Sequence, residues 1–186
     1  MSTWEIFAIA IGLAMDALAV AICRGLKNGR VKLSDAFITA LFFGGFQALM
    51  PLLGYLLGST FESYITAFDH WIAFVLLAII GINMIKEASS DCHVDDHRKS
   101  GILNLILLAI ATSIDALAIG VTFAFLKVNV VHAVAVIGGT AFVLSFIGVG
   151  VGSFIGAKFK KSAEIFGGII LIGMGTKILI EHLFFA

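Results

Sequence analysis

Six long apolar stretches follow one another along the chain, and short polar segments separate them. Each stretch holds roughly the 20 residues that a helix needs to cross the hydrocarbon core of a bilayer. The stretches are continuous and do not alternate apolar and polar residues at every second position, which favours helices over a membrane barrel. The pattern therefore predicts an all-α membrane protein with six transmembrane helices. The predicted spans are residues 4–23, 36–58, 69–86, 101–126, 130–154 and 163–183.

The second half of the chain repeats features of the first half. The frame around Asp16 (MDALAV) returns around Asp115 (IDALAI) at an offset of 99 residues, and Gly54 matches Gly148 at an offset of 94. Because each half has an odd number of spans, the second copy must run in the opposite orientation, as in many secondary transporters. The sequence therefore predicts two inverted three-helix repeats joined by a cytoplasmic linker. The predicted units are residues 1–90, 91–100 and 101–186.

Basic residues between the spans predict the orientation. The first, third and fifth connecting segments hold clusters of Lys and Arg, the second holds none, and the fourth holds only Lys127. By the positive-inside rule, the three basic segments are cytoplasmic and both termini lie outside the cytoplasm.

Composition supports a membrane protein and limits its partners. Of the 186 residues, 60% are hydrophobic and 13% are charged, whereas about a quarter of the residues in a soluble domain are charged. The formal net charge is 0, which argues against a nucleic-acid partner. The pairs Gly54/Gly58 and Gly148/Gly152 follow the small-xxx-small pattern of close helix contacts. These contacts are expected within the bundle or in a homodimer.

Asp16 and Asp115 each lie inside a predicted span. A carboxylate there costs about 2.5–3.5 kcal/mol on insertion scales, so an intramembrane acid indicates a site for a cation or a proton. Asp16 lies 12 residues after Trp4, and Asp115 lies 12 residues before Lys127, with both markers at the outer surface. At 1.5 Å per residue, each carboxylate is about 18 Å from that surface. The sequence predicts one midplane site formed by both acids; the alternative is a protonated pair that only joins helices.

Uncharged polar groups near the two acids are candidate ligands. The second span contains Gln47, Met50 and Pro51, and the proline frees a backbone carbonyl one turn earlier. Thr112 and Ser113 stand three and two residues before the second aspartate. The alternatives are structural: a kink, a glutamine bonded to a neighbouring helix, a methionine that fills space, and hydroxyls bonded to their own helix.

Asn83 and Lys177 occupy equivalent positions in the third and sixth spans. Lys177 could serve as a counter-charge to the aspartates. Its place near the outer end of its span instead favours an ammonium group that reaches the interface. Asn83, near the inner end, is expected to bridge helices.

These motifs resemble the bacterial manganese efflux pump family of the MntP type, which belongs to the wider group of LysE-like exporters. The resemblance covers essentially the whole chain and is carried by MDALAV, QALMPLLG, HWIAFVLL and SIDALAIGV. It implies a transporter, not an enzyme, that exports Mn²⁺ across the bacterial plasma membrane, with Asp16 and Asp115 essential. It also implies a family glycine at Gly25 and a position, here Gln47, that varies between glutamine and glutamate.

The chemistry of the candidate ligands suggests a mechanism. Carboxylate, amide and carbonyl oxygens suit Mn²⁺, Mg²⁺ or Ca²⁺, and only the resemblance selects manganese, as substrate and not as a tightly bound cofactor. After the metal leaves, two adjacent carboxylates repel each other, so uptake of H⁺ is expected and proton-coupled antiport is predicted. The alternatives are export of another divalent cation or a cationic amino acid. An intramembrane aspartyl protease is a further alternative, but neither aspartate has the Tyr-Asp or Gly-x-Gly-Asp frame of those enzymes.

Overall fold

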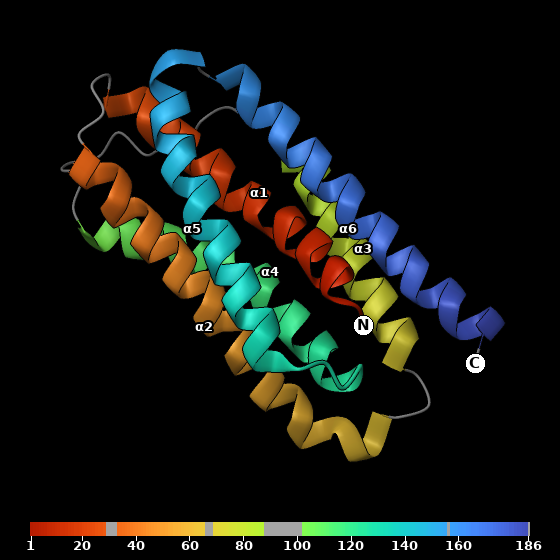
Figure 1. Ribbon diagram of the computed structural model, residues 1–186. Coiled ribbons are helices and arrows are strands. Elements are labelled where there is room, and N and C mark those ends of the chain that lie inside the picture. Colours follow the sequence, from red (N-terminus) through yellow and green to blue (C-terminus); the bar gives the residue numbers. More distant parts are fainter. Residues whose placement is uncertain (29–32, 66–68, 88–101, 156, 186) are drawn as a thin grey trace.

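The computed structural model describes residues 1–28, 33–65, 69–87, 102–155 and 157–185. The predicted linker, residues 91–100, lies outside the described residues. The described chain is helical almost throughout (Figure 1). Its elements are α1 (Thr3–Asn28), α2 (Leu33–Ile65), α3 (Asp69–Glu87), α4 (Ile102–Phe125), α5 (Val130–Ile155) and α6 (Ala157–Phe185).

Five of these helices are long and apolar enough to cross a membrane, so the chain is a multi-pass membrane protein. Among the described residues, α3 has a shorter apolar stretch, Phe74–Asn83, and a sixth span therefore stays a prediction. The candidate spans are Thr3–Leu26, Leu33–Thr60, Ile102–Phe125, Val130–Gly152 and Lys161–Ile180.

Helices that follow one another in the sequence make few contacts, and the packing joins the two halves of the chain instead. α1 packs along α5 and α6, α2 packs along α4 and α5, and α3 packs along α6. Figure 1 shows α1 between α5 and α6, and α1 is also the most buried of the candidate spans. The apolar faces of the first three helices are therefore covered mainly by the last three.

Glycines allow the closest approaches between helices. A Cβ atom added to Gly54 would lie 2.0 Å from the carbonyl oxygen of Leu117, and one added to Gly25 would lie 2.1 Å from that of Val149. Both distances are far below van der Waals contact, so backbone touches backbone between α2 and α4 and between α1 and α5. The glycine pairs that the sequence singled out make these contacts within the chain: Gly54, Gly58, Gly148 and Gly152.

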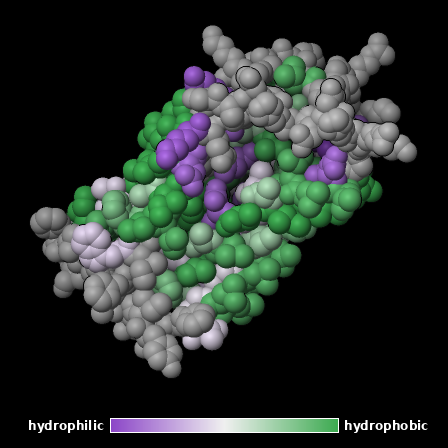
Figure 2. All heavy atoms as spheres, turned by 180° about the vertical axis from the view of Figure 1, so that it is seen from behind, coloured by the Kyte–Doolittle hydropathy of each residue, from purple (hydrophilic) through white to green (hydrophobic). Residues whose placement is uncertain are grey.

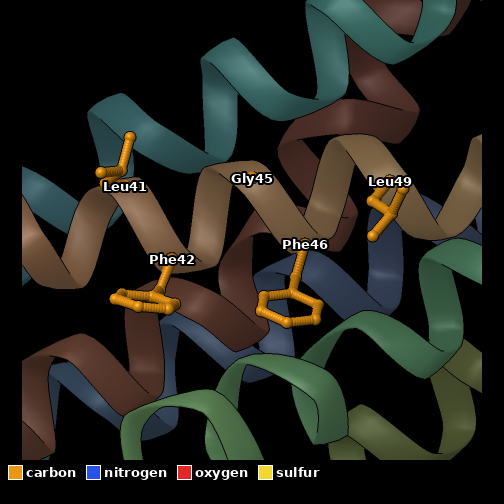
Figure 3. Close-up of a pocket in the computed structure, with 5 residues that line it drawn as sticks. All are labelled: Leu41, Phe42, Gly45, Phe46 and Leu49. Atoms are coloured by element: carbon orange, nitrogen blue, oxygen red, sulfur yellow. The ribbon is translucent and has the colours of Figure 1, made fainter. Parts of the chain in front are cut away.

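A different surface of small residues is uncovered. Gly45 and Gly139 have no atom within 4 Å of an added Cβ, and both line an apolar groove of about 510 Å³ between α2 and α5. A neighbouring hollow of about 330 Å³ on α2 is also lined by apolar residues (Figure 3), and in it Phe42 and Phe46 point to the same side of the helix. Neither contains a candidate ligand. The predicted homodimer stays a prediction, and this groove is a surface where small residues remain accessible.

Candidate cation site between α1 and α4

The two intramembrane aspartates meet. Asp16 on α1 and Asp115 on α4 are both half-buried, and their carboxyl groups are in hydrogen-bond contact. α1 and α4 make few other contacts. Two carboxylates this close repel each other, so the pair is stabilised by a proton or a cation between them. The structure thus brings together two acids that stand 99 residues apart in the sequence.

Gln47 on α2 is hydrogen-bonded to the backbone of α4 near Asp115 in the sequence. The side chain is fully buried, and its Nε2 atom donates a hydrogen bond of 3.1 Å to the backbone oxygen of Thr112. Its Oε1 atom accepts no hydrogen bond from any described residue, although an unsatisfied buried acceptor costs about 1–3 kcal/mol. Thr112 lies about one helical turn before Asp115, so the amide of Gln47 meets α4 about one turn from Asp115. Gln47 therefore bridges two helices with its nitrogen and leaves its oxygen available to a ligand.

Pro51 leaves polar backbone groups available in the same part of α2. It is buried within the helix, and a proline has no N–H group to donate to the carbonyl of Gln47. Its own carbonyl oxygen faces α4, since a Cβ added to Gly120 would lie 2.1 Å from it. Met50 is half-buried and packs against the apolar core, where its thioether fills space.

The two hydroxyl groups before Asp115 are bonded to their own helix. Thr112 Oγ1 donates to the carbonyl oxygens of Leu108 and Ala109, at 3.0 and 3.2 Å. Ser113 Oγ donates to Ala109 at 2.6 Å and is fully buried. Both hydroxyls thus make the back-bonds that are common in membrane helices. Thr112 is the more accessible of the two, because it is half-buried on the side of α4 that carries Asp115.

Lys177 pairs with the beginning of α1, and Asn83 lies on an exposed side of α3. The Nζ atom of Lys177 forms an ion pair with the carboxylate of Glu5 and so joins α6 to the first turn of α1. Asn83 is exposed in the described part of the chain, and its role as a bridge between helices stays a prediction. The exposure follows from the rotation of α3: Gly81 packs against α6, and Asn83, two residues later, points to the opposite side.

Sequence reasoning missed Glu164. This acid is 5% exposed and lies in the candidate span Lys161–Ile180 of α6. It follows a cluster of lysines and stands at the edge of a predicted span, so the sequence suggested the cytoplasmic end of a helix. A signal was present: Glu164, Gly168, Leu171 and Gly175 recur at helical spacing and mark one face of α6.

The chemistry of this region favours a hard cation. Within the described ranges, no group of three or more His, Cys, Asp or Glu side chains is close enough to hold a metal ion. A metal bound here would combine the two carboxyl groups with neutral oxygens such as that of Gln47. Such an oxygen-rich set suits Mn²⁺, Mg²⁺ or Ca²⁺ rather than the softer metals.

Comparisons with known proteins agree with one another. A family model described as "Putative manganese efflux pump" matches residues 30–179. Proteins named "Putative manganese efflux pump MntP" match nearly the full chain. The one from Acetivibrio thermocellus is 59% identical over 98% of this chain and 93% of its own length, and the one from Desulfitobacterium hafniense is 58% identical over 100% and 98%. That from Mannheimia succiniciproducens is 50% identical over the full length of both chains. No solved structure matches the chain.

Proposed function

This chain belongs to the manganese efflux pump family, and from that premise we propose that it exports Mn²⁺ from the cytoplasm through a midplane site formed by Asp16 and Asp115. As a member of a family of pumps, the protein is a transporter and not an enzyme. The observation that carries the proposed site is the contact between the two carboxyl groups, which come from different halves of the chain.

The proposed ligands are the two carboxylates and the Oε1 atom of Gln47, with water in the remaining positions. Mn²⁺ accepts such oxygen ligands, and the buried amide oxygen has no hydrogen-bond donor among the described residues. The oxygen of Thr112 is a further candidate on the same side of α4. Ligation by Ser113 or Met50 stays a prediction. The hydroxyl of Ser113 donates a hydrogen bond to its own helix, and the thioether of Met50 packs against the apolar core.

We also infer that the two halves of the chain are inverted repeats. Gly54 on α2 packs against Leu117 on α4, and Gly148, its match at an offset of 94, packs against Leu18, the match of Leu117 at an offset of 99. Equivalent contacts at equivalent positions are expected if both halves fold alike. A second such set supports the inference: Gly58 with Val121, and Gly152 with Ile22.

Two interfaces that the repeat would make equivalent differ in their packing. α1 packs along α6, whereas α4, the counterpart of α1, makes far fewer contacts with α3, the counterpart of α6. Figure 2 views the molecule from behind and shows hydrophilic residues gathered in a hollow of a largely hydrophobic surface. Inverted repeats that alternate between two such packings move a site from one side of the membrane to the other. This asymmetry supports transport by alternating access.

Proton coupling follows from the chemistry of the acid pair. Two carboxylates in contact repel each other, and either a proton or bound Mn²⁺ would relieve that repulsion, so the two compete for the site. Each metal ion that enters would therefore release H⁺ to the cytoplasm, and protons taken up outside would reset the site. The orientation proposed for this cycle has both termini outside the cytoplasm and the protein in the bacterial plasma membrane, as the lysine and arginine distribution indicates.

A pH step across proteoliposomes tests this function. With equal Mn²⁺ on both sides, antiport is expected to concentrate Mn²⁺ in the more acidic compartment, since protons leaving that compartment drive metal into it. Reversing the pH difference should reverse the direction of Mn²⁺ accumulation, and no accumulation should occur at equal pH. Mn²⁺ flux that ignores the step would contradict proton coupling alone. Flux of Mg²⁺, Ca²⁺ or lysine without any flux of Mn²⁺ would contradict manganese as the substrate.

Substitution of Gln47 tests the neutral ligand. We expect Gln47→Leu to raise the KM for Mn²⁺ on the order of tenfold, which corresponds to about 1.4 kcal/mol of binding free energy. Gln47→Glu should keep the affinity, because it retains an oxygen in the same place. If both variants raise KM equally, the side chain acts through its hydrogen bond to Thr112 and does not bind the metal.

A further inference from the structure

Glu164 is a buried acid for which the proposed site has no role. Its side chain is 5% exposed, and it lies within the candidate span of α6. Buried acids inside membrane spans are rare and mark the paths of ions or protons. Glu5 lies at the start of α1, at the other end of the bundle, and forms an ion pair with Lys177. The position of Glu164 relative to Asp16 decides whether it can serve the same cation.

The packing of α1 on α6 gives that position. A Cβ added to Gly12 would lie 2.9 Å from the side chain of Leu171 and 3.4 Å from the carbonyl oxygen of Gly167. The ion pair between Glu5 and Lys177 lies further toward the beginning of α1 and the end of α6. The two helices are therefore antiparallel, and steps forward along α1 correspond to steps backward along α6.

Starting from this contact, Asp16 lies about one helical turn further along α1, and Glu164 lies about one turn back along α6. Because the two helices are antiparallel, both steps run in the same direction along the bundle. Asp16 follows Gly12 by four residues, and Glu164 precedes Gly167 by three. Residues three or four apart share a helix face, so Asp16 lies on the face of α1 that meets α6. Glu164 lies on α6 between Gly167, which borders α1, and Gly168, which packs against Gly81 of α3. With 1.5 Å per residue, their levels along the bundle differ by on the order of one turn.

We propose that Glu164 forms a second cation-binding position, beside the aspartate pair, through which a divalent cation reaches Asp16. Asp16, Asp115 and Glu164 do not form one metal cluster, since the described residues contain no group of three such side chains. Glu164 therefore acts as a neighbouring position and not as a third ligand of the same ion. Its place near the beginning of α6 puts it on the side from which the proposed export loads its substrate. This inference rests on the proposed export of Mn²⁺.

Transport kinetics of Glu164→Gln test the proposal. In proteoliposomes with Mn²⁺ added on the cytoplasmic face, we expect KM to rise about tenfold and the maximal rate to change less than about twofold, because high metal concentration replaces the lost attraction. Glu164→Asp should stay within about threefold of the wild-type KM. Glu5→Gln is the matched control, with the same chemical change at the other end of the bundle, and should leave KM unchanged.

Each other outcome has a distinct meaning. An unchanged KM in Glu164→Gln would overturn the loading position and leave the proposed export intact. Equal losses in Glu164→Gln and Glu164→Asp, with a lowered melting temperature in both, would overturn it in favour of a purely structural role. Absence of Mn²⁺ flux through the wild-type protein would overturn the export and this inference together.

Discussion

Asp115→Asn is expected to abolish manganese efflux, and Asp16→Asn is expected to do the same. The two carboxyl groups are in contact, so the loss of either charge leaves the other to hold a divalent cation alone in the membrane. Removing one partner of a buried charged set costs about 3–5 kcal/mol, which corresponds to a loss of transport of at least about 100-fold. Asparagine keeps the size of the side chain and can still make a hydrogen bond, so the fold should persist.

Efflux from cells preloaded with Mn²⁺ measures this effect, with the amount of protein in the membrane determined for every variant. Asp35→Asn is a matched control, since Asp35 lies in the first turn of α2, far in sequence from both acids. It should transport as the wild type does. Full transport by either the Asp16 or the Asp115 variant would contradict a site shared by the two acids.

The second large effect is expected from a single methyl group at Gly54. In Gly54→Ala the added Cβ would lie 2.0 Å from the carbonyl oxygen of Leu117. That atom belongs to a helix backbone and cannot move aside, so α2 and α4 must separate along their length. We expect a loss of about 3 kcal/mol or more of stability, at the upper end of the range for overpacking. Thermal denaturation of the purified protein in detergent measures it.

Gly45→Ala is the control on the same helix. An added Cβ there meets nothing within 4 Å, and alanine favours helix over glycine by roughly 0.5–1 kcal/mol. The melting temperature should therefore stay the same or rise. If Gly45→Ala is as damaging as Gly54→Ala, the groove between α2 and α5 is covered by a second copy of the chain.

Hydropathy located the helices well because a membrane span must be apolar, but it did not locate their ends. α2 continues to Ile65, beyond the predicted residue 58, and α6 begins at Ala157, before the predicted residue 163. Both extensions contain polar or charged residues, including Glu62 and Lys160. Such residues leave the hydrocarbon without breaking a helix, since Glu and Lys are good helix formers. Hydropathy therefore marks the edge of the lipid and not the end of the hydrogen-bonded helix.

Asp16 and Asp115 could be singled out from the sequence because a charged residue in an apolar run is conspicuous. The rotation of each helix about its own axis could not be predicted in this way. Asn83 and Glu164 show the difference: the first turned out exposed and the second buried. The direction in which a side chain points depends on which helix packs beside it, and those neighbours come from the other half of the chain. The hydrogen bond from Gln47 to the carbonyl of Thr112 spans 65 residues and could not be read from local sequence.

The packing of α1 against α5 and α6 can form only late in synthesis. The ribosome makes α1 first and its partners last, so α1 enters the bilayer with the surfaces that will cover Asp16 still untranslated. An aspartate that faces lipid tails is energetically unfavourable, so the insertion of α1 is stabilised only when the last helices pack against it. A chain truncated before α5 would therefore leave α1 without the helices that cover it.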